Sequence, residues 1–357
     1  MAVDNLKDLY MDYLISSTQL TTCTGLSKVL DGEISHDRFT RMLSKGTFDS
    51  RSLWLQNKVM ACEISRASDT KVLILDDSIM AKPYTDENEI NCYHYDHCIG
   101  RAVKGVGFIT ALLNAQGMNV PVMMELIRKD LKVTDKKTGK EKRKASVGKN
   151  ELFRRMTAQC GQNLYIDYVL ADSWFCSNEN MKHLLKLKLD FAMAIKSNRL
   201  VALSEEDRNK GNWINIESLD LGQVAVTVWL KGLDRPLSLT RQVFKNGDDT
   251  ADLYLVCSDS GLSFDQISAL YKRRWSVEQY HKAVKQVTSF GKSPAKRAET
   301  QSNHFYLSIM AYSKMEILKV RSRTNEFQLK SRIYYNALKV AMEQIKELST
   351  NKYKNAA

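Results

Sequence analysis

The chain has 357 residues, which is long enough for two or three domains with a core of ordinary size. Its 53 Lys and Arg residues outnumber its 41 Asp and Glu residues, and the net charge of +12 favours a polyanionic partner, nucleic acid before an acidic membrane surface. No run of 18 apolar residues and no signal-peptide pattern occur, so we expect a cytoplasmic protein that does not act in a membrane.

The first 65 or so residues are predicted to be helical, because apolar residues recur there at three- and four-residue steps. Residues 24–30 and 35–43 are two short helices in this prediction, joined by a turn. The pair is compatible with a helix-turn-helix in which Arg38 and Arg41 face DNA. A purely structural helical hairpin is the alternative.

After Lys71, a continuous apolar segment, residues 72–75, leads into Asp76 and Asp77. Continuous apolar character predicts a strand that is covered on both faces, as in the centre of an α/β sheet. Neighbouring strand residues point to opposite faces, so only one of the two acids can join a given site. Two acids that merely cap the turn after the strand are the alternative.

Residues 92–98 place two Cys and two His residues within seven positions. A structural zinc site usually recruits a second ligand pair farther along the chain, and no suitably spaced Cys/His pair is present. A structural role for this segment is therefore preferred to zinc binding. Residues 105–113 and 120–127 then predict an antiparallel hairpin across a connector that contains Gly and Asn.

Residues 128–149 are rich in Lys and Arg and contain two glycines. The segment is interpreted either as a solvated loop or as a loop that neutralises DNA phosphates, and the two interpretations are compatible. A predicted strand that starts near residue 164 ends at Asp172. Residues 190–195 predict another strand, followed by Lys196 and Arg199, and the alternating pattern from about residue 200 to 259 predicts a β-rich insertion.

A helix is predicted from about residue 264 to 286, with Ser263 and Gln266 as a capping box. At 100° per residue a polar stripe runs along this helix. Its members are Tyr271, Arg274, Glu278 and Lys285. A solvated helix face with an ordinary ion pair is the simplest explanation of such a stripe. Two further long helices are predicted between about residues 300 and 346.

The spacing Tyr-x2-Arg-x3-Glu-x6-Lys in this stripe resembles the Y-R-E-K signature of bacterial DDE transposases of the insertion-sequence-four family. The resemblance covers about residues 71–286. It implies an α/β fold with a ribonuclease-H-like mixed sheet, a β-rich insertion and an N-terminal helical domain. The corresponding domain ranges are 1–68 (helical, DNA-binding), 69–199 (first part of the catalytic core), 200–251 (β-rich insertion) and 252–350 (last strand and C-terminal helices).

The resemblance also implies roles for individual residues. Asp77, as an Asp followed by Ser, matches the first catalytic acid, with Asp76 as the fallback; Asp172 and Glu278 match the other two. DNA contacts are expected from Tyr271, Arg274, Lys285, Lys282, His281, Lys196, Arg199, Arg38 and Arg41. Relatives hold an extruded base on an aromatic ring, for which Tyr254 and Trp229 are the candidates, although both could be core residues.

Three carboxylates that converge at a buried site need a cation to balance their charge. Oxygen ligands suit Mg2+ or Mn2+, and two such ions can clamp the attacking and leaving oxygens of a phosphoryl displacement. Asp77, Asp172 and Glu278 are therefore the expected metal ligands.

The expected function is a DDE transposase that cuts and joins DNA at the terminal inverted repeats of an insertion sequence, through a hairpin intermediate. It would act as a homodimer on double-stranded DNA, in association with the bacterial nucleoid. A catalytically silent or domesticated DNA-binding relative is the alternative, and a stand-alone ribonuclease-H-like nuclease is less favoured because of the insertion and the extra helical domain.

Overall fold

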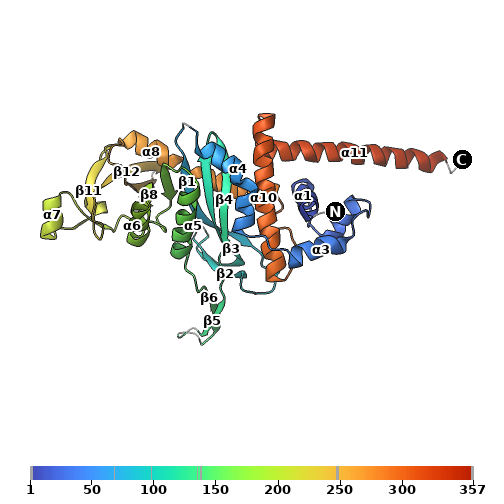
Figure 1. Ribbon diagram of the computed structural model, residues 1–357, viewed down its shortest axis with the longest axis horizontal. Helices are drawn as coiled ribbons and strands as arrows, with labels where there is room; N and C mark the ends of the chain where they lie inside the picture. The colour runs from blue at the N-terminus through green and yellow to red at the C-terminus, as the bar shows by residue number, and fades with distance from the viewer. Residues whose placement is uncertain are drawn as a thin grey trace. The chain divides into compact units, whose positions relative to one another are not determined.

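The chain is divided into two compact units, shown as a computed structural model in Figure 1. The structure describes residues 3–67, 69–97, 99–134, 136, 139–246 and 249–354. Unit 1 comprises the chain up to Phe48 together with the chain from His281 onward, and unit 2 runs from Asp49 to Tyr280. Among the helices in the described ranges, none is long and apolar enough to cross a membrane.

Unit 2 is built on a large mixed sheet. Its first strands are β1 (Val72–Ala81), β2 (Asn91–Asp96), β3 (Arg101–Ala115), β4 (Met118–Leu126), β7 (Tyr168–Ala171) and β8 (Asp190–Ile195). Strand β1 pairs antiparallel with β3 on one side and parallel with β7 on the other, and β7 pairs parallel with β8. Strand β4 extends this core by pairing antiparallel with β3. The order β4-β3-β1-β7-β8, with these directions, confirms the ribonuclease-H-like fold.

Strand β1 is central because its first four residues, Val72 to Leu75, are fully buried on both faces. One face is covered by helices α4 (Ser50–Ser65), α5 (Lys149–Asn163) and α6 (Asn178–Lys186). The apolar side chains of Leu73 and Leu75 belong to the same buried cluster as Phe153 of α5. The continuous apolar run in the sequence is therefore explained by helices above and strands beside it.

The β-rich insertion continues the same sheet beyond β8. Its elements are β9 (Leu200–Ala202), α7 (Glu205–Lys210), β10 (Ile214–Asn215), the 3-10 helix η1 (Ile216–Ser218), β11 (Val226–Leu230), β12 (Leu237–Asn246) and β13 (Asp249–Cys257). Strand β13 pairs antiparallel with β8, and β12 pairs with β13. The chain thus returns to the core sheet through β13.

The single helix predicted for residues 264–286 is wrong: two helices occupy this range. Helix α8 (Phe264–Lys272) ends before Arg273, and α9 (Trp275–Val287) starts after Arg274. The Arg273 guanidinium donates hydrogen bonds to the Asn114 side chain and to the carbonyl oxygens of Asn114 and Thr70. These bonds anchor the junction to the sheet, and helical periodicity alone does not reveal them.

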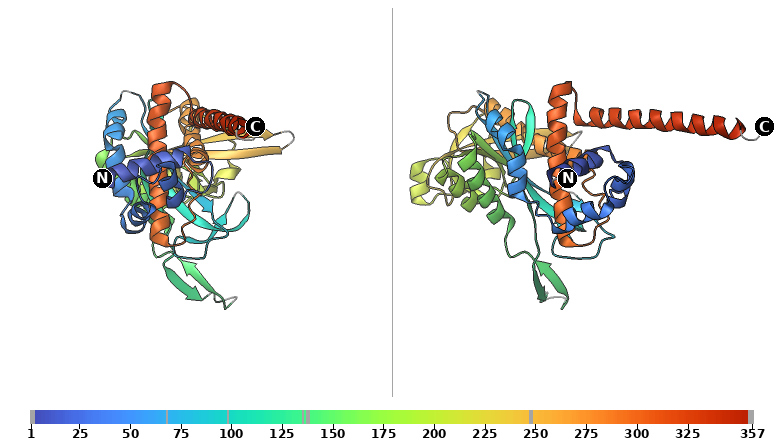
Figure 2. Two further views of the ribbon diagram at one scale, coloured as in Figure 1. Left: turned by 90° about the vertical axis from the view of Figure 1, so that its right-hand side faces the viewer. Right: turned by 45° about the vertical axis from the view of Figure 1, so that its right-hand side comes forward.

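Two short strands, β5 (Leu131–Thr134) and β6 (Glu141–Lys144), form a separate antiparallel ribbon between β4 and α5. Figure 1 and both views of Figure 2 show the ribbon extending away from the large sheet. The basic segment of the sequence is therefore partly ordered into strands.

Unit 1 is helical. Its elements are α1 (Val3–Ser16), α2 (Cys23–Val29), α3 (His36–Lys45), α10 (Ala298–Ser322) and α11 (Glu326–Lys354). Helix α10 is buried against α1 and α3, where the Tyr10 hydroxyl lies 2.9 Å from His304 Nδ1 and the Asn303 amide donates to the carbonyl oxygens of Leu43 and Gly46. The predicted pair of short helices is present as α2 and α3, with Ser35 capping α3.

The compact units divide the chain differently from the expected domain ranges. Helix α4 lies in unit 2, because it packs on β4 and β3 and places Ala61 and Ile64 in the sheet's core. The chain after Tyr280 lies in unit 1, because α10 packs on the N-terminal helices.

Replacing Phe153 with Ala is expected to lower the free energy of unfolding by about 3–5 kcal/mol, since a fully buried ring is lost and a cavity remains. The ring stacks on Phe175 with centroids 5.2 Å apart. Urea denaturation followed by circular dichroism measures the change. Tyr84→Ala, at a residue that is 98% exposed, is the control and should shift stability by less than about 0.5 kcal/mol. Equal losses in both variants would contradict the assignment of this core.

Candidate active site

Asp76 and Asp77 point to opposite faces of β1. Asp76 pairs across the strands with Thr110, whereas Asp77 pairs with Ile109. Ile109 belongs to the cluster beneath α5 that also holds Leu73 and Leu75. Thr110 lies on the other face, where its side chain interacts with the Tyr280 hydroxyl of α9. Cross-strand partners share a face, so Asp76 lies on the α9 face and Asp77 on the α5 face.

Arg274 links Asp76 to Glu278. Its Nη1 lies 3.8 Å from Asp76 Oδ2, and its Nη2 donates to Glu278 Oε1 at 2.7 Å. The guanidinium also lies 5.7 Å from the centre of the Tyr271 ring. Burial opposes the charge on Arg274, but Tyr271, Glu278 and Asp76 together raise its pKa. Tyr271, Arg274 and Glu278 of the predicted stripe are thus brought together around Asp76.

Asp77 has a different partner. Its Oδ2 forms a 2.7 Å ion pair with Nζ of Lys149, the first residue of α5. The same ammonium group lies 5.6 Å from the centre of the Trp174 ring. The carboxylate of Asp77 is therefore already paired with a cation from the chain itself.

Asp172 follows β7 directly, and its Oδ1 accepts a hydrogen bond from the Trp174 amide at 3.0 Å. The parallel pairing of Ile74 with Leu170, continued by two residues, brings Asp172 beside Asp76. Burial raises the pKa of Asp172, with a further contribution from Asp77, while the amides of Phe175 and Trp174 oppose the rise. Two half-buried carboxyl groups thus meet on the α9 face of the sheet.

The pKa of Asp76 is raised to about 7 by burial and then by the charge of Asp172, against the opposing effect of Arg274. Perturbed carboxyl groups in close proximity are typical of catalytic and metal sites. The oxygen donors of Asp76 and Asp172 suit a hard divalent cation, which would relieve their mutual repulsion.

The third carboxylate is engaged elsewhere, since Glu278 accepts its hydrogen bond from Arg274. Within the described ranges, no group of three Asp, Glu, His or Cys side chains is arranged to hold a metal ion. The expected ligand set of Asp77, Asp172 and Glu278 is therefore not assembled here and stays a prediction. The donor chemistry of Asp76 and Asp172 nevertheless fits the metal.

Lys196 and Tyr254 line one pocket of about 480 Å³ that also includes Ser173, the residue after Asp172. Lys196 is exposed, whereas Tyr254 is 5% exposed and belongs to the core cluster. The pocket adjoins the acidic edge of the sheet. Trp229, the other proposed stacking residue, is half-buried and covered by the Arg208 guanidinium, 4.6 Å from its ring centre.

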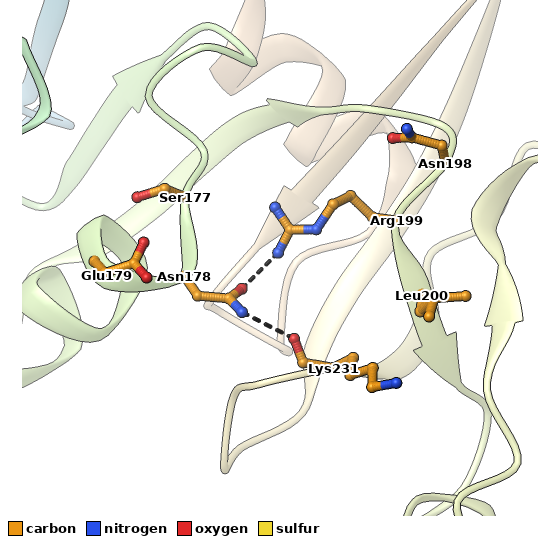
Figure 3. Close-up of a pocket in the computed structure, with 7 residues that line it drawn as sticks. All are labelled: Ser177, Asn178, Glu179, Asn198, Arg199, Leu200 and Lys231. Carbon is orange, nitrogen blue, oxygen red and sulfur yellow. Dashed lines mark hydrogen bonds between the residues drawn. The ribbon is translucent and has the colours of Figure 1, made fainter.

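Arg199 and Lys231 both line a second pocket, of about 470 Å³ (Figure 3). The Arg199 guanidinium donates hydrogen bonds to the Cys176 carbonyl oxygen and to the Asn178 side chain at the start of α6. The Asn178 amide in turn donates to the Lys231 carbonyl oxygen. Asn178, at the start of α6, is thus hydrogen-bonded both to Arg199, just before β9, and to Lys231, just after β11. The sequence alone did not indicate this structural role of Arg199.

The remaining predicted DNA contacts lie in unit 1. Arg41 is exposed on α3 and Arg38 is half-buried there. On α9, Lys282 is exposed and Lys285 half-buried, whereas His281 is buried and its pKa is lowered to about 3 by burial and then by Lys285. The neutral, enclosed ring of His281 is not presented to DNA in this arrangement.

The region around Cys92 forms no metal centre among the described residues. Cys92 Sγ lies 3.4 Å from His94 Nε2, and both side chains are buried. Cys98, which the zinc hypothesis also needs, lies outside the described residues.

Sequence reasoning missed Lys149 and Trp174 as site residues. Trp174 is 46% exposed beside Asp172, and a large aromatic residue immediately after a strand-end acid was the available signal. No sequence signal distinguished Lys149, because it is one of many lysines in the basic segment.

Comparison with known families decides the class. The family described as Transposase DDE domain matches residues 133–314, which is half of the chain, and that described as DDE superfamily endonuclease matches residues 4–211. The chain belongs to the DDE transposase family. It is therefore a nuclease-type enzyme of a superfamily that generally uses divalent metal ions.

Other comparisons add little for this transposase. No curated protein matches its sequence. A solved structure described as the Drosophila P element transposase strand transfer complex is 12% identical, with a TM-score of 0.26. The match covers 53% of this chain and 37% of that one, and so distant a likeness indicates nothing about function.

Asp76→Asn is expected to stabilise the metal-free transposase at pH 8 and to do so less at pH 5. Because the pKa is about 7 in the folded chain and 3.8 for an ordinary Asp, ionisation costs stability as pH rises between these values. The Asn side chain removes this cost, which is at most about 4 kcal/mol. Urea denaturation in EDTA at both pH values measures the difference.

Asp77→Asn is the matched control for this experiment. It loses the ion pair with Lys149 and should not gain stability at pH 8. A gain of the same size at pH 5 and pH 8 for Asp76→Asn would contradict the assignment of the raised pKa.

Proposed function

We propose that the chain is a DDE transposase that cuts DNA at the ends of an insertion sequence and joins them to target DNA. The observation that carries this proposal is the convergence of Asp76, Asp172 and the Arg274–Glu278 pair at one edge of a ribonuclease-H-like sheet. The family assignment supports it. The setting is the bacterial nucleoid, with double-stranded DNA as the partner.

We assign the first catalytic acid to Asp76 rather than Asp77. Asp76 shares a face with α9 and lies within reach of Arg274, which holds Glu278. Asp77 faces α5 and is paired with Lys149. Because a common ion must touch all its ligands, the acid on the α9 face is better placed to act with Glu278.

Asp76, Asp172 and Glu278 would hold Mg2+ or Mn2+, two ions per site, and the metal supplies activation of the attacking oxygen and neutralisation of the leaving one. For Glu278 to take part, its bond to Arg274 must open. The guanidinium fork is suited to exchange a carboxylate for a DNA phosphate, because both accept two parallel hydrogen bonds. Tyr271, against the same guanidinium, positions Arg274 for that exchange.

The Y-R-E-K signature and the insertion-sequence-four family remain part of this proposal. Tyr271, Arg274 and Glu278 lie together, and Lys285 lies farther along α9. DNA contacts by Lys285, Lys282, Lys196, Arg38 and Arg41 are proposed on the strength of their basic charge. For the hairpin step, Trp174 is a better stacking candidate than Tyr254 or Trp229, since it is exposed beside Asp172.

A DNA-binding protein without cutting activity is the second candidate function. The observation that favours it is that the site's acids are already balanced by Arg274 and Lys149, with no three-residue metal group among the described residues. In an enzyme these cations yield to metal and DNA, whereas in a silent relative they stay in place.

The homodimer is proposed to form through α11. Beyond its first turns this helix extends away from the rest of unit 1 (Figures 1 and 2). From Tyr334 onward, apolar residues repeat along it at steps of four and three, as in a coiled-coil seam. They are Tyr334, Leu338, Ala341, Ile345 and Leu348, all largely exposed. A second copy of the helix offers the matching seam.

Glu278→Gln is expected to reduce nicking by at least about 100-fold, because a carboxylate ligand of the metal is lost. DNA binding should survive, because the basic residues proposed to contact DNA are unchanged. The assay uses duplexes from the DNA that flanks the gene, where inverted repeats should bracket it, with Mg2+. Asp76→Asn and Asp172→Asn should behave alike, and Asp77→Asn should lose less activity.

Each outcome of the nicking assay separates the candidates. Binding without cleavage by the wild-type chain would favour the silent DNA-binding protein. Cleavage that depends on Asp77 and not on Asp76 would overturn the assignment of the first acid.

Leu338→Glu combined with Ile345→Glu is expected to weaken dimerisation by at least about 100-fold, because two charges enter an apolar seam. Sedimentation equilibrium with and without a DNA duplex measures it. Asn336→Glu with Val340→Glu adds the same charge on the outward face and should leave the dimer intact. A wild-type chain that stays monomeric in both conditions would contradict the dimer.

A further inference from the structure

A row of aromatic rings connects the end of β2 to the loop after β7. This aromatic row consists of Tyr95 on β2, His97 in the turn that follows, and Trp174. The ring centres of Tyr95 and His97 lie 4.8 Å apart, and those of His97 and Trp174 lie 5.6 Å apart. The fold therefore brings rings from two distant segments of unit 2 into one continuous surface.

The rings of the aromatic row are open to solvent. Tyr95 is 56% exposed and Trp174 is 46% exposed, and His97 is exposed as well. Tyr93 lies two residues before Tyr95, hence on the same face of β2, and is also exposed. Aromatic side chains usually bury most of their large apolar surface, so a group of exposed rings indicates a binding surface.

The aromatic row begins at the candidate acids. The backbone amide of Trp174 donates a hydrogen bond to Asp172 Oδ1 at 3.0 Å. On the other side of the ring, the Lys149 ammonium group lies 5.6 Å from the Trp174 ring centre and 2.7 Å from Asp77 Oδ2. A DNA strand with a phosphate at Asp172 would therefore have its neighbouring nucleotides beside the row.

The geometry of the aromatic row suits unpaired bases. Successive bases of a duplex strand are about 3.4 Å apart and cover each other's faces. The ring centres of the row are farther apart than that, and the ring planes are inclined by 72° and 48° to their neighbours. Bases that have left the duplex can follow such a row, because their free faces stack on aromatic rings in any sequence.

We propose that the aromatic row binds consecutive unpaired bases of a DNA strand next to the candidate acids, starting with a base on Trp174. This inference rests on the proposed function, because it takes DNA as the partner. It goes beyond one extruded base in a hairpin step, since three rings hold a short single-stranded stretch. The net charge of +12 attracts the phosphates of that strand, and the rings select its unpaired form.

The test compares a labelled oligothymidine of about 12 nucleotides with a duplex of the same length, both measured by fluorescence anisotropy in EDTA. Trp174→Leu removes the ring and keeps the backbone amide that contacts Asp172. Loss of one stacked base is expected to weaken oligothymidine binding by at least about fivefold. Duplex binding should change by less than about twofold, because the faces of paired bases are covered.

Two further variants separate stacking from charge and from packing. Trp174→Phe keeps a ring and should bind oligothymidine within about threefold of the wild type, whereas Tyr95→Ala should weaken binding by at least about threefold. The slope of log K against log salt should change by less than about 0.5 in all three variants, because no phosphate contact is removed.

The matched control is Tyr165→Ala. Tyr165 is 66% exposed, but it precedes β7, whereas Asp172 follows that strand, so its ring lies at the opposite strand end. Its removal should change oligothymidine binding by less than about twofold. Equal losses in Tyr165→Ala and Tyr95→Ala would overturn the proposal.

Three other results would also overturn it. They are a wild-type chain that does not bind oligothymidine, a Trp174→Leu variant that binds it as the wild type does, and a Trp174→Leu variant that loses equally on both forms of DNA. The last result would show a general loss of folded protein or of DNA affinity.

The nicking assay separates this inference from the proposed function. If the wild-type chain cuts its flanking repeats and Trp174→Leu binds oligothymidine as the wild type does, the proposal for the aromatic row alone fails. If the row variants lose oligothymidine binding as expected but no chain cuts, that proposal stands and the enzymatic proposal fails.

Discussion

Repulsion between two half-buried carboxyl groups is the constraint around which the site is arranged. Asp76 lies within β1, beside Asp172 at the end of β7, and the charge of Asp172 raises the cost of ionising Asp76. Burial makes this cost larger, since the low-polarity interior screens charge poorly. Arg274 relieves part of it and carries Glu278 with it. A chain that keeps such an unfavourable arrangement is one in which a bound cation or phosphate is expected to complete it.

The two faces of β1 give the adjacent aspartates separate roles. On the α9 face, Asp76 joins Arg274, Tyr271 and Glu278, which are the groups suited to metal and phosphate chemistry. On the α5 face, Asp77 fixes Lys149 at the start of the helix that follows the basic ribbon. Adjacent residues of the strand therefore contact two different helices, α9 through Arg274 and α5 through Lys149.

The large sheet gives these groups a rigid support. The insertion adds strands to the same sheet through β13 and β8, so the pocket lined by Lys196 and Tyr254 is held by main-chain hydrogen bonds. Unit 1 brings a different kind of surface, with exposed Arg41 on α3 and the apolar seam of α11. Unit 2 therefore carries the candidate catalytic acids with Arg274 beside them, and unit 1 carries the exposed Arg41 and the apolar seam.

The buried strands and the candidate acids could be predicted from the sequence because both leave local signals, and the resemblance to a known family implied the class of fold. Continuous apolar runs that end in Asp76, Asp77 and Asp172 predict buried strands, and the spacing of Tyr271, Arg274 and Glu278 resembles a signature of DDE transposases. Only the tertiary structure decided which aspartate faces Glu278, because that depends on which helix covers each face of β1. It also decided the helix break at Arg273 and the pairing of Lys149 with Asp77. Those contacts join residues 72 to 159 positions apart, and no local pattern records such a partner.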